Sequence, residues 1–189
     1  HATFFINSMC HYFGKRTHDI KSTARDSWIV SWFTFGEGYH NYHHKFQWDY
    51  RNGVKWFAYD PSKWIIKGLS LIGITYDLKK VKENVIIQNR LNNIKIQLTD
   101  LFNASNQTLK NSYQNRIEQL NTKSERLFEL WSEMEVKYAA QMAKGRLKNK
   151  EIIRGLIQER KRYKSQLNSI RIDLQVIMSY VQKKRFPAN

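Results

Sequence analysis

The sequence predicts an all-α protein, and three observations support that fold class. In the second half of the chain, apolar residues recur at alternating spacings of three and four, which is typical of helices packed along a seam. Asp60 and Pro61 form a helix start, with aspartate at the N-cap and proline at the first helical position. The spacing H-x-x-H-H, formed by His40, His43 and His44, places three imidazoles on one face of a helix.

Composition divides the chain into residues 1–81 and residues 82–189. All six histidines, the only cysteine and five of the six tryptophans precede residue 82. The first region carries eleven basic and six acidic residues, whereas the second carries 21 basic and ten acidic residues. We therefore expect a site-bearing domain followed by a basic, helical, coiled-coil-like tail. The net charge of +16 favours an anionic partner, such as nucleic acid, an acidic protein or a membrane surface.

The first region begins with an apolar segment and a polar loop. Residues 2–13 predict the end of a helix in which Asn7 and His11 lie one turn apart on the same face. The polar stretch "GKRTHDIKST" predicts a loop, and Asp19 or Ser22 is expected to cap the helix that follows it.

Two further features complete the first region. Gly36 and Gly38 predict a bend in the chain just before His40. The helix that starts at Pro61 is amphipathic and is expected to lie against a core or a membrane surface. Its apolar residues are Trp64, Ile65, Leu69, Leu71 and Ile72.

The tail is expected to form three helices of roughly 20 to 40 residues, with breaks near residues 103–107 and 144–150. The second break is short enough for the third helix to reverse direction and pack antiparallel to the second. The alternative is a parallel homodimer of one extended helix, which a charged Arg160 in the seam disfavours. The three seams comprise Ile87, Leu91, Ile94, Leu98 and Leu101; Tyr113, Ile117, Leu120, Ser124, Leu127, Trp131, Met134 and Tyr138; and Ile153, Leu156, Arg160, Tyr163, Leu167, Ile170, Leu174, Ile177 and Val181.

The histidine cluster indicates a metal site. Three neutral imidazoles can bind one cation together, whereas three protonated imidazoles would repel one another. A catalytic zinc held by the H-x-x-H-H histidines is one alternative, but a structural zinc is disfavoured because Cys10 is the only thiolate. Glu37 and Asp49 are expected to orient the ligand histidines as hydrogen-bond acceptors. The competing interpretation is that these are ordinary surface or core histidines.

Four stretches of the first region resemble a known family. They are "TFFINSMCHYFG", "STARDSW", "FTFGEGYHNYHHKFQWDYRNG" and "WFAYDPSKWIIKGLSLIGITYDLKKV". Together they are similar to the carboxy-terminal part of acyl-CoA (stearoyl-CoA type) delta-nine fatty acid desaturases, over about residues 1–81. The motif G-E-G-x-H-N-x-H-H is highly specific and carries most of the resemblance. The stretches "HATFFINS" and "FQWDYRNG" point to bacterial-like members.

The resemblance implies a set of metal ligands. His11 matches the ligand that ends the family's N-S-x-x-H motif, and His40, His43 and His44 match its last histidine box. Asn7 matches the asparagine that reaches an iron through a water molecule. Two earlier histidine boxes of the family are absent from these 189 residues, so we expect a fragment that is inactive by itself.

The family implies a membrane-bound oxidoreductase with two non-haem iron ions. Its fold has four membrane-spanning helices and a cytosolic cap, so residues 1–81 would belong to that cap and the tail would lie on the cytoplasmic side. The implied reaction is the O2-dependent introduction of a cis double bond into a saturated fatty acyl chain, carried by CoA or a lipid. Membrane lipid and an electron donor, such as a ferredoxin or cytochrome, are the implied partners. Candidate residues for an apolar substrate tunnel are Trp28, Trp32, Phe33 and Trp48, with core packing as the alternative.

Several features fall outside the family pattern. His1 and His18 lie outside the ligand positions and are interpreted as a membrane-helix residue and a loop residue. No apolar run within these residues approaches the roughly 18 to 20 residues of a spanning helix. The tail carries no recognisable nucleic-acid-binding motif, so no nucleic acid partner is expected. The rival function is a coiled-coil interaction protein that carries an inactive desaturase remnant.

Overall fold

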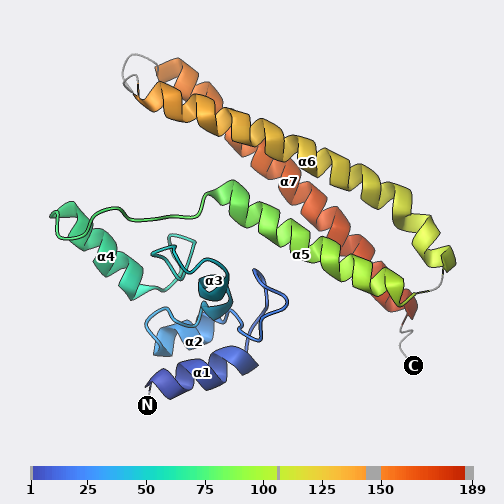
Figure 1. Cartoon of the computed structure of the whole chain (residues 1–189), viewed down its shortest axis with the longest axis horizontal. Coiled ribbons are helices and arrows are strands. Elements are labelled where there is room, and N and C mark those ends of the chain that lie inside the picture. The colour runs from blue at the N-terminus through green and yellow to red at the C-terminus, as the bar shows by residue number, and fades with distance from the viewer. Residues whose placement is uncertain (1, 106, 144–149, 186–189) are drawn as a thin grey trace. The chain divides into compact units, whose positions relative to one another are not determined.

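A computed structural model describes residues 2–105, 107–143 and 150–185. Within these ranges the chain is mainly helical and contains no strand, which confirms the all-α prediction (Figure 1). Extended pairing among the described residues is limited to isolated bridges of Asp26 with Lys15 and with Tyr39. The chain divides into two compact units, residues 1–93 and residues 94–189.

The helices follow the predicted order along the chain. The breaks expected near residues 103–107 and 144–150 coincide with the ends of helices, although residues 144–149 themselves lie outside the described ranges. The helices are α1 (Ala2–Tyr12), α2 (Trp28–Phe33), α3 (His40–Lys45), α4 (Pro61–Leu71), α5 (Glu83–Asn103), α6 (Gln107–Ala143) and α7 (Lys150–Arg185).

The starts of α2 and α4 show which side chains cap them. Asp60 caps α4 as predicted, since its Oδ1 accepts the backbone N–H of Lys63 at 3.0 Å. The predicted cap of α2 is wrong, because Ser27 performs this role through the N–H of Val30. Asp19 is unavailable for α2 because its Oδ1 accepts backbone N–H groups two and three residues later, within its own turn.

A glycine turn leads from α2 into α3, as predicted. Gly36 adopts a φ of +102°, which side-chain-bearing residues rarely adopt. A Cβ atom at Gly38 would lie 2.2 Å from the backbone nitrogen of Ser31, so only glycine permits this close approach. The carbonyl of Gly38 accepts the N–H of Ser27 at 2.8 Å. The turn therefore fixes the start of α3 against the start of α2.

Helix α4 buries a lysine rather than its apolar side chains. The Nζ atom of Lys63 donates to the carbonyls of Gly53, Lys55 and Ala58 at 2.7–3.1 Å, and the residue is 6% exposed. Of the two predicted surfaces for the apolar face, a core and a membrane surface, a core does not cover it among the described residues, and contact with a membrane stays a prediction. Exposed residues on it include Trp64, Ile65, Leu71 and Ile72.

The first compact unit extends beyond the boundary suggested by composition. Val81 and Ile86, which stand on either side of that boundary, share one buried apolar cluster with Tyr42 and Phe46 of the histidine region. The first half of α5 therefore packs as part of the first unit. The division into domains of residues 1–81 and 82–189 stays a prediction. Packing instead divides the chain after Asn93, within α5.

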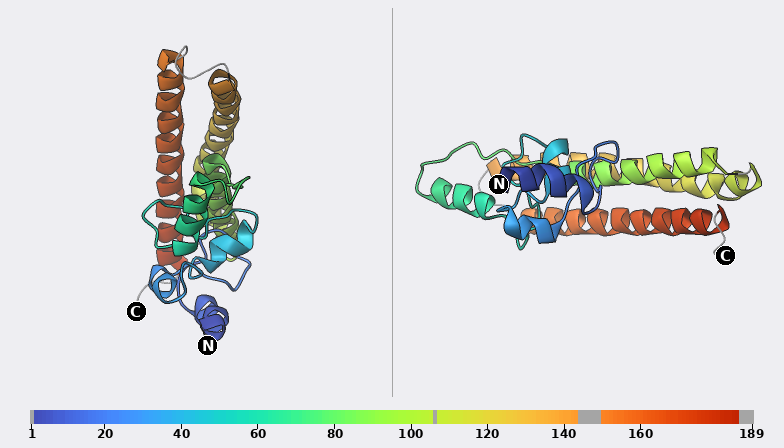
Figure 2. Two further views of the ribbon diagram at one scale, coloured as in Figure 1. Left: turned by 90° about the vertical axis from the view of Figure 1, so that its left-hand side faces the viewer. Right: turned by 90° about the horizontal axis from the view of Figure 1, so that it is seen from below.

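In the second unit, α6 and α7 run antiparallel, as predicted (Figures 1 and 2). Arg116 near the start of α6 pairs with Asp173 near the end of α7 at 3.4 Å. At the opposite end, Arg160 pairs with Glu135 at 2.6 Å and lies over the ring of Tyr138. The charge in the third seam is thus compensated by the facing helix.

Burial follows the predicted seams closely in α6 and α7. In α5 the seam differs at both ends, where Ile86 and Phe102 are buried instead of Ile87 and Leu101. An α-helix has 3.6 residues per turn, so a strict heptad pattern drifts off the buried face over a 21-residue helix. Seam residues that are buried in α6 and α7 are Leu120, Ser124, Leu127, Trp131, Met134, Ile153, Leu156, Leu167, Ile170, Leu174, Ile177 and Val181.

The buried seam of α7 predicts that shortening a side chain lowers the free energy of unfolding much more on the buried face of the helix than on the exposed face. Leu174 is fully buried, whereas Val176 on the same helix is 60% exposed. Leu174→Ala is expected to lower the free energy of unfolding by about 2 to 5 kcal/mol because it leaves a cavity. Val176→Ala should change it by less than about 0.5 kcal/mol. Urea unfolding followed by circular dichroism at 222 nm measures both; equal losses would contradict the assigned seam.

Candidate metal centre

Helix α3 is capped by a side chain that is distant in sequence. No side chain of Tyr39, its N-cap residue, caps it. Instead, Oδ1 of Asp26 accepts the backbone N–H of Tyr42 at 2.9 Å. The bridges of Asp26 with Lys15 and Tyr39 hold this carboxylate in place. The aspartate therefore fixes the first turn of α3, which begins at His40.

His11 stands in the last turn of α1 and is held from two sides. Its Nδ1 atom lies 2.8 Å from the hydroxyl oxygen of Thr23. We assign Nδ1–H as the donor, which leaves the Nε2 lone pair free for a cation. The backbone N–H of Arg25 donates to the carbonyl of Cys10, and its guanidinium donates to the carbonyl of His11. The segment after the loop thus pins the end of α1.

Three imidazoles from α1 and α3 come together. His11, His40 and His44 each offer a nitrogen within 4.8 Å of the others. The Nε2 atoms of His40 and His44 are 3.0 Å apart, and the ring centroid of His11 lies 5.1 Å from that of His40. Two nitrogens bound to one cation at about 2.1 Å and at a right angle lie about 3.0 Å apart. The spacing therefore fits two ligands of one metal ion.

Two imidazoles of the cluster, those of His40 and His44, have lowered pKa values. Burial, followed by the neighbouring histidines, lowers the pKa of His40 to about 4. Burial also lowers the pKa of His44. Within the described residues, Nδ1 of His40 is buried and has no hydrogen-bond partner. A neutral imidazole keeps one nitrogen lone pair, so His40 and His44 can each bind a cation.

The other two predicted site residues lie beside this trio. The ring of His43 is 6.5 Å from that of His40 and 6.3 Å from that of His44. On a helix, positions i+3 and i+4 lie on opposite sides of position i, and the tight cluster that includes His11 involves His44 rather than His43. The H-x-x-H-H trio considered for zinc is therefore not the tightest group. Asn7 is exposed and lies one turn before His11 on α1.

The expectation that Glu37 and Asp49 orient histidines is wrong. Asp49 receives a bidentate pair of hydrogen bonds from Arg51 and one from the hydroxyl of Tyr42. Burial would raise the pKa of Asp49, but these hydrogen bonds outweigh it and lower the pKa. Oε1 of Glu37 accepts the amide of Asn52. Both carboxylates thus organise the loop after α3.

Three residues that fix the geometry were missed from the sequence. Asp26 and Thr23 contact α3 and His11, yet nothing in their local sequence reveals these distant partners. Asn41 is the second residue of the H-N-x-H-H motif, so the sequence alone placed it next to a predicted ligand. Its hydrogen-bond partners, however, are 17 to 23 residues away in the chain.

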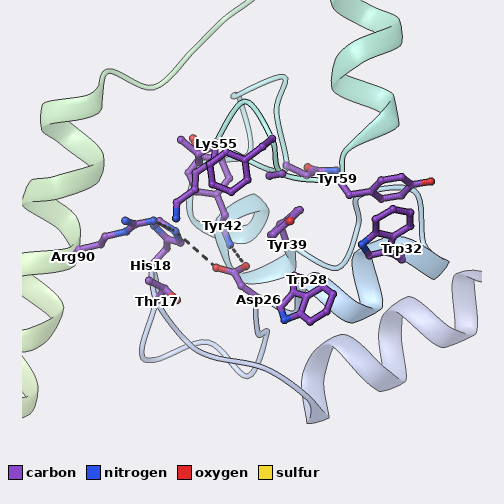
Figure 3. Close-up of a pocket in the computed structure, with 14 residues that line it drawn as sticks. Thr17, His18, Asp26, Trp28, Trp32, Tyr39, Tyr42, Lys55, Tyr59 and Arg90 are labelled. Atoms are coloured by element: carbon purple, nitrogen blue, oxygen red, sulfur yellow. Dashed lines mark hydrogen bonds and ion pairs between the residues drawn. The ribbon is translucent and has the colours of Figure 1, made fainter.

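A cavity of about 430 Å³ opens beside His18 in the first unit (Figure 3). Trp28 and Trp32 line it, and the indole of Trp32 stacks on Tyr59 with ring centroids 4.1 Å apart. Phe33 and Trp48 are not among its lining residues. All four candidate tunnel residues are more than half exposed, so core packing does not explain them in this structure. The lining also includes Asp26, Tyr42, Lys55 and Arg90.

His18 is a loop residue, as predicted, but a buried one. Its ring packs edge-on against Tyr42 and Phe46, and it is 3% exposed. Burial and the nearby Arg90 lower its pKa to about 3, so the imidazole is neutral and its 3.8 Å contact with Asp26 is not an ion pair. His1, expected to be a membrane-helix residue, lies outside the described residues.

An all-α unit with clustered imidazoles on two short helices defines a candidate metalloprotein. Comparison with curated proteins then confirms the desaturase resemblance. The chain is 56% identical over 85 residues to acyl-CoA desaturase 1 of Saccharomyces cerevisiae, and 46% identical over 86 residues to a probable acyl-CoA desaturase of Schizosaccharomyces pombe. It is 41% identical over 86 residues to the sn-1 stearoyl-lipid 9-desaturase of Synechocystis. These relatives are desaturases by name, and desaturases are oxidoreductases.

The similarity covers part of each protein. It spans 45–46% of this chain but only 17%, 18% and 27% of the three relatives, respectively. The aligned lengths are close to that of residues 1–81, where the motifs occur. The expected bacterial likeness is not supported, since the identity is higher for the two yeasts than for the cyanobacterium. No protein-family model matches the chain. Among the described helices, none is both long enough and apolar enough to cross a membrane.

The buried His18 predicts a measurable pH dependence of folding. Above pH 6.5 its imidazole is neutral in both the folded and unfolded states. Below pH 6.5 the unfolded chain binds a proton that the folded state refuses down to about pH 3, so stability falls as pH falls. Between pH 7 and pH 5 this residue should remove about 2 kcal/mol of unfolding free energy.

His18→Gln should flatten that slope by this amount in urea titrations followed by tryptophan fluorescence. The pKa of Asp26, which burial raises to about 6, produces an opposite slope that both proteins share. The comparison therefore isolates His18. Identical slopes in the two proteins would contradict a buried neutral imidazole.

Proposed function

We propose that this chain supplies part of the di-iron centre of a fatty acyl desaturase. The observation that carries the proposal is the convergence of His11, His40 and His44, whose nitrogens lie within 4.8 Å, in a segment similar to desaturases. These three imidazoles would hold one iron ion. His43 would serve the second ion, and Asn7 would reach an ion through a water molecule.

The residues of this chain contribute imidazole donors in fixed positions. Thr23 holds the ring of His11, and Asp26 holds the first turn of α3. The low pKa of His40 keeps its imidazole neutral, so that one ring nitrogen retains a lone pair that can bind a cation. When bound, the two iron ions would supply O2 activation, by which two hydrogens are removed from adjacent methylenes and a cis double bond is left. Further histidines are needed to complete the two iron sites.

The proposed substrate is a saturated acyl chain carried by CoA or by a lipid, and the proposed location is a membrane, with the site and the tail on its cytoplasmic side. The exposed apolar face of α4 supports contact with a membrane surface, since Ile65, Leu71 and Ile72 are all more than 60% exposed. The net charge of +16 supports an acidic electron donor, such as a ferredoxin or a cytochrome. We further propose that the antiparallel α6 and α7 form a coiled-coil hairpin.

A chimaera tests the function directly. The 85-residue matched stretch would replace its counterpart in Saccharomyces cerevisiae acyl-CoA desaturase 1, in a strain without its own enzyme. The chimaera is expected to form unsaturated fatty acids, measured by gas chromatography. His43→Ala or His44→Ala should reduce them at least about 100-fold, since each removes a ligand rather than packing volume.

Lys45→Ala is the matched control, because Lys45 is an exposed residue on the same short helix. It should retain most of the activity of the chimaera. If the chimaera is made in normal amounts and inserted in the membrane but forms no double bonds, the desaturase role fails. That result would favour an interaction protein with an inactive remnant. Retained activity in either histidine variant would refute the ligand assignment.

A further inference from the structure

The loop that joins α1 to α2 contacts both histidine-bearing helices. The side chain of Thr23 holds the ring of His11. Asn41 of α3 is fully buried. Its side-chain amide can make four hydrogen bonds, and all four are made to this loop. Its Oδ1 accepts the backbone N–H groups of His18 and Asp19 at 2.7 and 3.0 Å. Its Nδ2 donates to the carbonyls of Asp19 and Ala24 at 2.8 and 2.9 Å.

These hydrogen bonds of Asn41 couple the loop rigidly to α3 and therefore to the histidine cluster. Asn41 is the immediate neighbour of His40, so a displacement of the loop cannot occur without breaking buried hydrogen bonds or moving α3. Buried polar groups left unpaired cost more than the net gain of forming the bonds. The loop and α3 are therefore expected to move together.

Helix α5 holds the same loop from the opposite side. The amide of Asn89 donates to the carbonyl of His18 at 2.6 Å, and the amide of Asn93 donates to the carbonyl of Thr17 at 3.3 Å. The guanidinium of Arg90 lies 3.2 Å from Nε2 of His18. Figure 3 shows the Arg90 side chain extending from its helix toward His18. Because the imidazole is neutral, its Nε2 lone pair can accept from this guanidinium.

We propose that Asn89 and Asn93 are positioning residues for the histidine cluster, acting through the Thr17–Asp19 loop and Asn41. Both asparagines lie beyond residues 1–81, the segment that resembles desaturases. The first helix of the tail thus serves the site rather than only linking two units. The consequence for metal binding rests on the proposed function, whereas the coupling of α5 to α3 does not.

Hydrogen exchange on the whole 189-residue chain tests the coupling. The double variant Asn89→Ala/Asn93→Ala is compared with Asn92→Ala, which changes the same residue type at an exposed position of the same helix. Loss of two hydrogen bonds should speed exchange roughly tenfold at the loop amides and at the α3 amides of residues 41–45. Exchange in α6 and α7 should not change, and Asn92→Ala should match the wild type throughout.

A second variant distinguishes a local effect from a general loss of structure. Asn89→Asp keeps the shape of the side chain but replaces the amide donor by an acceptor that faces a carbonyl. It should give the same local pattern with an unchanged circular dichroism spectrum. If both variants leave exchange in α3 at the wild-type rate, the proposal is overturned.

Titration with Co2+, followed by its visible absorption, reads the effect on the site. The double variant should bind Co2+ several-fold more weakly than Asn92→Ala, with an altered band shape. Faster exchange in α3 with unchanged Co2+ affinity and spectrum would overturn the positioning role. Failure of the wild-type chain to bind Co2+ would instead count against the proposed metal site, and the exchange rates in α3 would still decide the coupling.

Discussion

The buried amide of Asn41 is the interaction on which the geometry of the first unit depends. Helix α3 has only six residues, too short to hold its position by its own backbone hydrogen bonds. Its position must come from outside, and four hydrogen bonds from one side chain supply it from the loop side. Asp26 supplies the cap, and the apolar cluster around Tyr42 supplies the packing. The loop bound by Asn41, the cap from Asp26 and the apolar cluster thus fix the position of α3 and of the three histidines that it carries.

The surroundings of the cluster lower the pKa of His40 and of His44, chiefly through burial. The carboxylates nearest in sequence, Glu37 and Asp49, are both occupied, by Asn52 and Arg51 respectively. A free carboxylate beside the rings would favour their protonation and so compete with a metal ion. Burial has the opposite effect at His40, where it lowers the pKa. The polar network therefore stabilises the loops and engages Glu37 and Asp49, whereas the charge of Asp19 still acts on His44, where it raises the pKa.

The sequence was sufficient wherever the determinant is local. The cap at Asp60, the helical spacing of the histidines and the seams of α6 and α7 depend on residues within one or two turns, and these predictions are confirmed. It was insufficient where a partner lies far along the chain. The carbonyl ring around Lys63 and the distant acceptor at Asp26 leave no periodic signal, because periodicity records which face is apolar and not which polar group is satisfied.

The position of the unit boundary follows from the same distinction. Composition changes near residue 81 because all the histidines, six of the eight glycines and most aromatic residues precede it. Packing, however, depends on which residues contact one another and not on composition. Ile86 joins the apolar cluster of Tyr42, and Asn89 and Asn93 bind the loop that holds α3. The other half of α5 buries Leu98 and packs in the second unit. One continuous helix therefore contributes to two cores. Removing its first half together with the tail would expose the apolar cluster that supports the histidines.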